Sequence, residues 1–252
     1  MATAAFFDLD RTLIRRSSAL ALAGSFRERG MISRRELARA AYWQLLFVAR
    51  GADEQTIRGV AERALRVLRG FRPEEMQGLV AGAMEPVLKP LVYAEPLALV
   101  EQHRDRGERV YIVSAALQEI VDALAAELGF DGAVGTICEV EDGVYTGRSL
   151  RVLHGVAKAE AVRELAAREG IDLEASTAYS DSDSDLPFLE SVGHPVVVNP
   201  DRGLRAAAAE RGWPVLEFGE RAYPHARRRI PSALVGLPLL VGAAWALRRR
   251  AA

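Results

Sequence analysis

Between residues 94 and 211 the chain alternates between stretches in which apolar residues have helical spacing and short apolar runs typical of buried strands. The strand-like runs are residues 108–116, 176–181 and 194–200. A further apolar run at residues 4–10 ends in Asp8 and Asp10. Because strands and helices of this length alternate, we expect an α/β fold with a mainly parallel sheet covered on both faces.

Two regions depart from this alternation. Residues 17–88 keep helical spacing with no strand pattern, which indicates an all-helical insertion after the first strand. Residues 133–148 contain two β-rich runs around Glu141-Asp142-Gly143, which predicts a hairpin. We therefore divide the chain into an α/β core (residues 1–14 and 89–225), a helical insertion (15–88) and a tail (226–252).

Polar clusters follow three of the predicted strands. Asp8 and Asp10 end the first, Ser114 ends the second, and the sequence SDSDSD from Ser180 to Asp185 ends the third. Open parallel sheets bind ligands at the carboxyl ends of their strands. We expect these distant pieces of sequence to form a single site.

In their order and rough spacing, these residues resemble the motifs of the haloacid dehalogenase (HAD) phosphatases. Asp8-Leu9-Asp10-Arg11-Thr12 resembles the DxDxT first motif, Val113-Ser114 the second, Lys158 the third, and Ser180–Asp185 the acidic fourth. The resemblance covers roughly residues 3–217 and is to subfamily IB, near the phosphoserine phosphatase branch. It implies a Rossmann-like core with a type-1 helical cap at residues 15–88.

The resemblance also implies a role for each carboxylate. Asp8 is the expected nucleophile, which forms an aspartyl-phosphate, and the Asp10 side chain is the expected general acid–base. Two carboxylates and a backbone carbonyl suffice for Mg²⁺, which prefers oxygen ligands and keeps several waters. The expected metal site comprises Asp8, Asp10 through its backbone carbonyl, Asp181, and Asp185 at or just behind the metal.

Phosphate oxygens are expected to bind Ser114, the adjacent backbone amides including that of Ala115, and Lys158. The chain has 31 arginines and only two lysines, Lys89 and Lys158. Where a lysine stands in place of the usual arginine, we expect the local chemistry to require it. A compact ammonium fits among several carboxylates and a phosphate, where a guanidinium is too wide. The alternative is that Lys158 is an ordinary surface lysine.

Several other residues have weaker predictions. Thr12 is expected to orient the loop after Asp8, and Ser184 is a candidate partner for phosphate or Lys158. Asp183 is predicted to be a solvated loop residue. An EF-hand reading of the stretch fails, because it would need Gly and Glu where Leu186 and Val192 stand.

The tail has a different character from the rest of the chain. Residues 230–247 are eighteen uncharged residues between two arginine triplets. As a helix they would extend roughly 27 Å, close to the ~30 Å hydrocarbon core of a bilayer. We expect a C-terminal apolar helix that anchors the chain in a membrane; the alternatives are a buried terminal helix and an interfacial segment. The lone Cys138 and the absence of a secretory signal favour a cytoplasmic catalytic domain.

These features together predict a Mg²⁺-dependent phosphomonoester hydrolase. The cap carries 13 Arg against eight Asp and Glu and lacks an acidic residue in its first stretch, IRRSSALAL, where the phosphoserine branch binds an amino group. An anionic, membrane-associated phosphate of the lysophospholipid type is therefore the expected substrate, and a soluble phosphorylated metabolite the alternative. A phosphotransferase and a non-catalytic membrane-tethered adaptor also remain open. The net charge of −1 gives no reason to expect a nucleic-acid partner.

Overall fold

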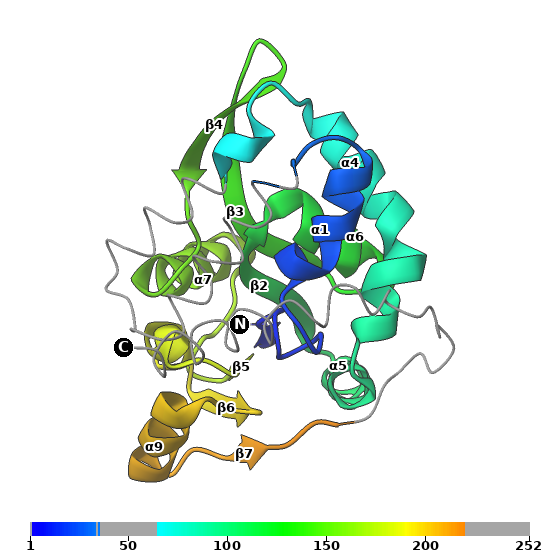
Figure 1. Cartoon of the computed structure of the whole chain (residues 1–252). Helices are drawn as coiled ribbons and strands as arrows, with labels where there is room; N and C mark the ends of the chain where they lie inside the picture. The colour runs from blue at the N-terminus through cyan, green and yellow to red at the C-terminus, as the bar shows by residue number, and fades with distance from the viewer. Residues whose placement is uncertain (1, 34, 36–64, 220–252) are drawn as a thin grey trace, which may run out of the picture.

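The computed structural model describes residues 2–33, 35 and 65–219 (Figure 1). In this part of the chain, seven strands form one sheet in the order β4-β3-β2-β1-β5-β6-β7. Neighbouring strands are parallel except β3 and β4, which form an antiparallel hairpin. The strands are β1 (Ala4–Phe7), β2 (Arg109–Leu117), β3 (Gly132–Glu141), β4 (Val144–Arg151), β5 (Thr177–Ser180), β6 (His194–Val198) and β7 (Val215–Leu216).

The central strand β1 explains why both faces of the sheet must be covered. All four of its residues are apolar and fully buried. Successive side chains point to opposite faces, so Ala5 and Phe7 pack in one hydrophobic cluster and Ala4 and Phe6 in the other. The predicted α/β fold with a mainly parallel sheet is therefore confirmed.

Helices cover the two faces as the alternating sequence predicts (Figure 1). One face carries α5 (Ala94–Asp105) and α6 (Gln118–Leu128); Val100 of α5 and the buried residues of α6 belong to the cluster that contains Phe7. The other face carries α7 (Val156–Glu169), α8 (Leu186–Leu189) and α9 (Arg202–Arg211). Helix α6 is capped by Gly129 in the left-handed conformation, φ 74°, which glycine adopts readily.

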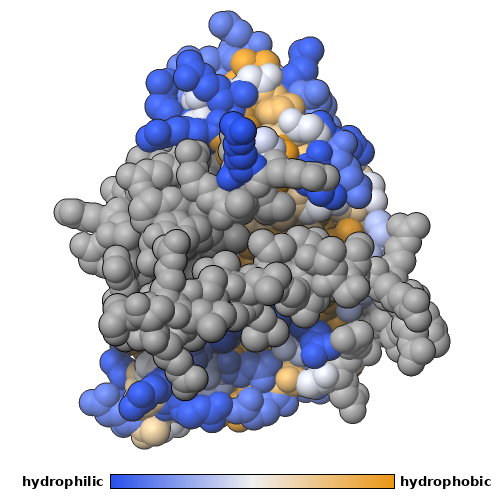
Figure 2. Space-filling model, viewed as in Figure 1, coloured by the Kyte–Doolittle hydropathy of each residue, from blue (hydrophilic) through white to orange (hydrophobic). Residues whose placement is uncertain are grey.

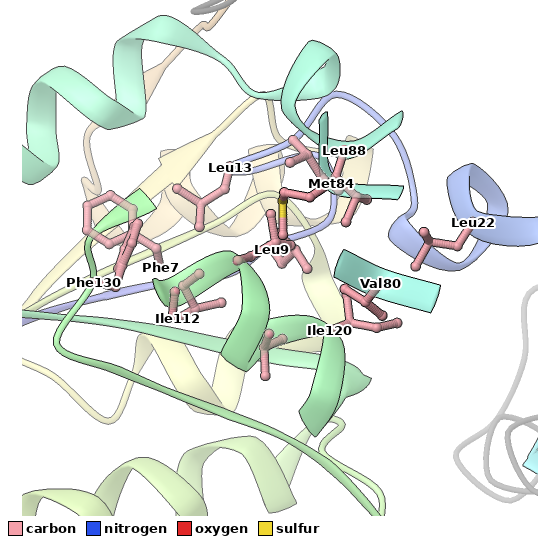
Figure 3. Packing of buried hydrophobic residues seen from close by; sticks show 14 of the residues in the cluster. Phe7, Leu9, Leu13, Leu22, Val80, Met84, Leu88, Ile112, Ile120 and Phe130 are labelled. Atoms are coloured by element: carbon pink, nitrogen blue, oxygen red, sulfur yellow. The ribbon is translucent and has the colours of Figure 1, made fainter. Parts of the chain in front are cut away.

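The described parts of the insertion are helical. They are α1 (Ser18–Glu28), η1 (Arg66–Leu68), α4 (Pro73–Ala83) and η2 (Met84–Leu88). The short helix η3 (Lys89–Leu91) follows at the start of the second core segment. Residues 36–64 lie outside the described part. In Figure 3, Val80 of α4 lies between Leu22 of α1 and Ile120 of α6, and all three belong to one cluster with Leu88 and Leu13. The insertion and the sheet thus share one hydrophobic cluster.

The β3–β4 hairpin also contacts the insertion. Its turn has positive φ at both Asp142 (51°) and Gly143 (77°), the conformation of a tight hairpin turn, and confirms the predicted turn. Farther along β4, the Tyr145 carbonyl accepts from Gly70 N–H at 2.9 Å and Tyr145 N–H donates to Phe71 O at 2.8 Å. The hairpin therefore holds the C-terminal part of the insertion by backbone hydrogen bonds.

Two strand features differ from the sequence prediction. The short strand β7 was not predicted, because two residues carry too little pattern. Strand β2 ends at Leu117, one residue beyond the predicted run of residues 108–116, because Leu117 pairs with Thr136 after a shift of register.

The predicted apolar helix at residues 230–247 lies outside the described part of the chain. Within that part, no helix combines the length and the apolar character needed to cross a bilayer. On the face shown in Figure 2, the described surface is mainly hydrophilic along the lower edge and upper sides, with hydrophobic residues between the upper sides.

Candidate active site

The sheet order brings three predicted motifs to neighbouring strand ends. Strand β1 lies between β2 and β5, and Phe7 is in register with both Ile112 and Tyr179. Asp8 follows β1 directly, and its N–H donates to Tyr179 O at 2.9 Å. Because parallel strands end at the same edge, the segments after β1 and β5 meet with Ser114 of β2 at this edge.

Lys158 enters this site from the first turn of α7. Its side chain is 1% exposed, and its Nζ lies 2.7 Å from Asp8 Oδ1 and 2.7 Å from Asp185 Oδ2. The ammonium also lies 4.7 Å from the centre of the Phe188 ring. Burial lowers the pKa of Lys158, but the nearby charges of Asp185 and Asp8 outweigh it and the net shift is upward. The lysine is thus a buried cation between two carboxylates, not a surface residue.

Asp8 is 6% exposed and has one carboxylate oxygen bonded to Lys158. Burial raises the pKa of Asp8 to about 7, with the charges of Asp185 and Asp10 acting in the same direction and Lys158 opposing them. Since Lys158 engages Oδ1, Oδ2 is the oxygen left to react or to bind a cation.

Asp10 is held by the first residue of the cap helix α1. Ser18 N–H donates to Asp10 Oδ1 at 2.8 Å. Burial raises the pKa of Asp10, and the hydrogen bond from the Ser18 backbone opposes the rise. Ser18 itself is fully buried and was not among the predicted site residues. A serine near a helix start signals the helix, but nothing in the sequence indicates that its amide contacts a carboxylate.

The three aspartates of the acidic stretch after β5 lie in different environments. Asp181 is 3% exposed, and burial together with the charge of Asp8 raises its pKa to about 8. Asp185 Oδ2 accepts from Ser180 Oγ at 2.5 Å and from Lys158. Asp183 is exposed, as predicted. Asp185 therefore supports Lys158, and its role as a metal ligand stays a prediction.

The remaining predicted residues lie at or near the same edge. Ser114 is 2% exposed, and Ala115 beside it is exposed. Thr12 is fully buried, and its hydroxyl has no hydrogen-bond partner within the described residues. Ser184 Oγ lies 3.0 Å from Ser182 Oγ, so the contact found is with its neighbour and not with Lys158.

Mg²⁺ requires oxygen ligands, and the carboxylates at this edge of the sheet are candidates to supply them. In residues 2–33, 35 and 65–219, no group of three His, Cys, Asp or Glu side chains could hold a metal ion by itself. Asp181 Oδ2, however, is buried and accepts no hydrogen bond from the described residues, although Arg11 Nε lies 3.2 Å away. A buried carboxylate oxygen without a donor is what a hard cation would satisfy. Asp8 and Asp181, with backbone carbonyl oxygen and water, therefore fit a Mg²⁺ site.

The chain is similar to known proteins along most of its length. The family model described as haloacid dehalogenase-like hydrolase matches residues 5–190. A Streptomyces azureus protein named "Inhibition of morphological differentiation protein" is 41% identical over 99% of this chain and 95% of its own length. A "Probable phosphatase" of Mycobacterium tuberculosis is 42% identical over 98% of this chain and 90% of its own length.

A second Mycobacterium tuberculosis relative, named as a phosphoserine phosphatase, is 36% identical over 93% of this chain and 76% of its own length. Among solved structures, a Bordetella pertussis protein of unknown function has a TM-score of 0.75 and 29% identity. The match covers 86% of this chain and 98% of that one. The similarity thus extends beyond the strand-end motifs to most of the chain.

Proposed function

The chain belongs to the haloacid dehalogenase-like hydrolase family and is a phosphatase, and from this premise we propose that it hydrolyses phosphomonoesters through an aspartyl-phosphate on Asp8, with Mg²⁺ as cofactor. The observation that carries the proposal is the buried cluster in which Lys158 bridges Asp8 and Asp185. Such a cluster is costly to bury unless its charges are paired, so it indicates a functional site.

In the first step, Asp8 Oδ2 attacks the phosphorus and the ester oxygen leaves. Lys158 holds Asp8 Oδ1 and so fixes the direction of attack. When bound at Asp8, Asp181 and the Asp10 carbonyl, Mg²⁺ supplies positive charge that lowers the repulsion between the carboxylate and the phosphate. Ser114 and the amides beside it bind phosphate oxygens.

Asp10 handles the proton in both steps. Its Oδ1 accepts from Ser18 N–H, so Oδ2 is the oxygen that carries the proton to the leaving alkoxide. The same oxygen then takes a proton from the water that hydrolyses the aspartyl-phosphate. Burial raises the pKa of Asp10, which favours the protonated form needed in the first step.

Hydrolysis of an aryl phosphate, with and without Mg²⁺, tests this function. Asp8→Asn keeps the shape of the side chain but lacks the nucleophilic oxygen, and should lower kcat/KM by at least ~10³-fold. Loss of activity on removal of the metal with a chelator, and its return with Mg²⁺, are expected for wild type. Full activity of Asp8→Asn would refute the nucleophile.

The substrate is proposed to be an anionic phosphomonoester, since the cap is rich in arginine and Arg11 presents a half-exposed guanidinium beside Asp181. A lysophospholipid-type phosphate at a membrane, with residues 230–247 as the anchor, is the form we propose; the name of one relative makes phosphoserine the second candidate. Comparing kcat/KM for the two substrates, on full-length protein and on protein truncated after Arg229, separates them. Efficient turnover of phosphoserine alone, by a full-length protein found in the soluble fraction, would exclude the lipid proposal.

A phosphotransferase would use the same intermediate. Added acceptor alcohols distinguish it, because they would yield new phosphate esters in place of inorganic phosphate. A non-catalytic adaptor is disfavoured, because the nucleophile, the acid–base, the lysine and the acidic fourth motif are all present.

A further inference from the structure

Thr136, which belongs to no motif, connects two segments of the candidate active site. It lies on β3, is 3% exposed, and donates from Oγ1 to Ala115 O at 2.7 Å. The same hydroxyl oxygen accepts from Leu153 N–H at 3.1 Å. Ala115 follows Ser114, and Leu153 precedes the helix that carries Lys158. One buried hydroxyl therefore joins the two segments expected to contact phosphate.

The segment that Thr136 holds is an irregularity in β2. Val113 pairs with Val134 of β3, but Leu117 pairs with Thr136, so β2 contains two more residues than β3 over this stretch. Ser114, Ala115 and Ala116 lie in the resulting bulge, which we call the phosphate bulge (residues 114–116). Bulges redirect backbone groups next to active sites, and this one needs contacts that fix its shape.

Two further contacts hold Gln118, the first residue of α6 just after the phosphate bulge, against β3. Gln118 Oε1 accepts from Gly135 N–H at 2.6 Å, and Gln118 Nε2 donates to Ala133 O at 3.1 Å. Gly135 also lets the bulge approach closely, since a Cβ atom there would lie 2.9 Å from Ala116 O. Strand β3 and the bulge are thus packed without space between them, and Thr136 supplies the bond at the bulge's centre.

The bond from Thr136 determines where the next amide points. In a trans peptide the C=O and the following N–H point in opposite directions, and the described chain has no cis peptide bond. Because Ala115 C=O points toward Thr136, Ala116 N–H points away from β3. It donates a hydrogen bond to Ser114 Oγ at 3.2 Å. The amide and the hydroxyl are therefore presented together on the side of the bulge that faces away from Thr136.

We propose that Thr136 is a positioning residue for phosphate binding. Its hydroxyl orients the Ala115–Ala116 peptide so that Ala116 N–H holds Ser114 Oγ, whose own O–H then donates to a phosphoryl oxygen. The same hydroxyl holds the Leu153 segment at a fixed place beside them. The proposal rests on the proposed function and adds to it a positioning residue that the motifs do not contain.

Removal of the hydroxyl should act on phosphate affinity. Thr136→Val keeps the shape of the side chain but leaves Ala115 O and Leu153 N–H buried without their partner, so the bulge is expected to rearrange. Thr136→Ser keeps the hydroxyl. Thr146→Val is the matched control, because Thr146 lies on the same hairpin and donates to Glu139 at 2.6 Å, outside the site.

The measurement is calorimetric binding of inorganic phosphate in the presence of Mg²⁺, together with KM and kcat for an aryl phosphate. Thr136→Val should raise the phosphate Kd about tenfold, the loss expected for one hydrogen bond to the ligand. Thr136→Ser should stay within about threefold of wild type, and Thr146→Val should leave the Kd unchanged even if it lowers Tm. A purely structural role would lower Tm and leave the Kd the same.

If wild-type protein binds phosphate but does not hydrolyse phosphomonoesters, the proposed hydrolase function is refuted. The phosphate Kd values of the Thr136 variants would still test the proposed role of Thr136. Wild-type protein that binds no phosphate, or a Thr136→Val variant with wild-type Kd, would overturn the inference. If Thr136→Val does not fold, Thr136→Cys, with a weaker donor of similar size, takes its place. It should bind phosphate more weakly than Thr136→Ser, and equal binding by the two would overturn the inference as well.

Discussion

At the scale of single residues, the two lysines of this arginine-rich chain show how environment decides function. Each is paired with two carboxylates: Lys158 with Asp8 and Asp185, and Lys89 with Glu85 and Glu127. Lys158 is buried beside the proposed nucleophile, whereas Lys89 links the end of the insertion to α6. Composition alone marks both lysines as unusual, and only the motif order separates the proposed active-site lysine from the structural one.

The two lysines therefore form a matched pair for mutation. Lys158→Arg should lower kcat/KM by at least ~10²-fold, because the buried space between two carboxylates does not fit a planar guanidinium. Lys89→Arg should keep activity within about threefold, since an arginine can still pair with Glu85 and Glu127 at a partly exposed position. Steady-state kinetics on an aryl phosphate checks both. Equal losses in the two variants would contradict the role given to Lys158.

Asp181 makes a prediction about stability and pH. In the folded protein burial raises the pKa of Asp181 from 3.8 to about 8. Between these two pH values the folded state therefore keeps a proton that the unfolded state has released. The folded state is therefore favoured at low pH, and this contribution is lost as pH rises from about 4 to about 8. In metal-free protein, the Tm of wild type should fall more between pH 5 and pH 8 than the Tm of Asp181→Asn.

The measurement is thermal unfolding with a chelator at both pH values, followed by addition of Mg²⁺. Mg²⁺ should raise the Tm of wild type most at pH 8, because it binds the ionised carboxylates, and should raise that of Asp181→Asn less. Identical pH slopes for the two proteins would show that Asp181 is not the group responsible.

At the scale of elements, the start of helix α1 connects the insertion to the proposed acid–base. Ser18 is the first residue of α1, and its N–H holds Asp10 Oδ1. Proline is well tolerated at the first helical position, and Ser17 before it is already extended, with φ −61° and ψ 128°. Ser18→Pro therefore removes the N–H while helix α1 stays intact, whereas Ser18→Ala removes only the hydroxyl.

The two variants should differ in their dependence on the leaving group. If Ser18 N–H positions the acid, Ser18→Pro should lower kcat/KM for an alkyl phosphate at least ~10-fold more than for 4-nitrophenyl phosphate, whose leaving group needs little protonation. Ser18→Ala should preserve the wild-type ratio. Equal losses on both substrates in Ser18→Pro would indicate general damage to the fold.

The elements themselves could largely be predicted from the sequence, because each is long enough to show its period. The predicted strands, the hairpin turn and the helical spacing between the strands are all present in the described part of the chain. The contacts of Ser18 and Thr136 could not be predicted. Any residue at position 18 other than proline supplies a backbone N–H, and a threonine in a strand is ordinary. Their roles depend on where the bulge and the insertion lie, which no local pattern encodes.

At the scale of the whole molecule, the candidate site depends on segments far apart in sequence that share one edge of the sheet. Asp8 and Lys158, 150 residues apart, are joined directly. Hydrophobic side chains of the insertion and the sheet form one cluster beside this edge (Figure 3). The first residue of the insertion's helix α1 therefore reaches Asp10 from an element that packs on α4 and η2. The central claim for the whole molecule is that this arrangement makes Asp8 a covalent nucleophile.

Chemical trapping of the intermediate tests this claim most directly. Wild type mixed with a labelled phosphomonoester and quenched in acid should carry the label on the peptide that contains Asp8. The label should be released by hydroxylamine, as expected for an acyl phosphate, and should be absent from Asp8→Asn. An enzyme that turns over substrate yet carries no label at Asp8, or carries it on another residue, would contradict the account.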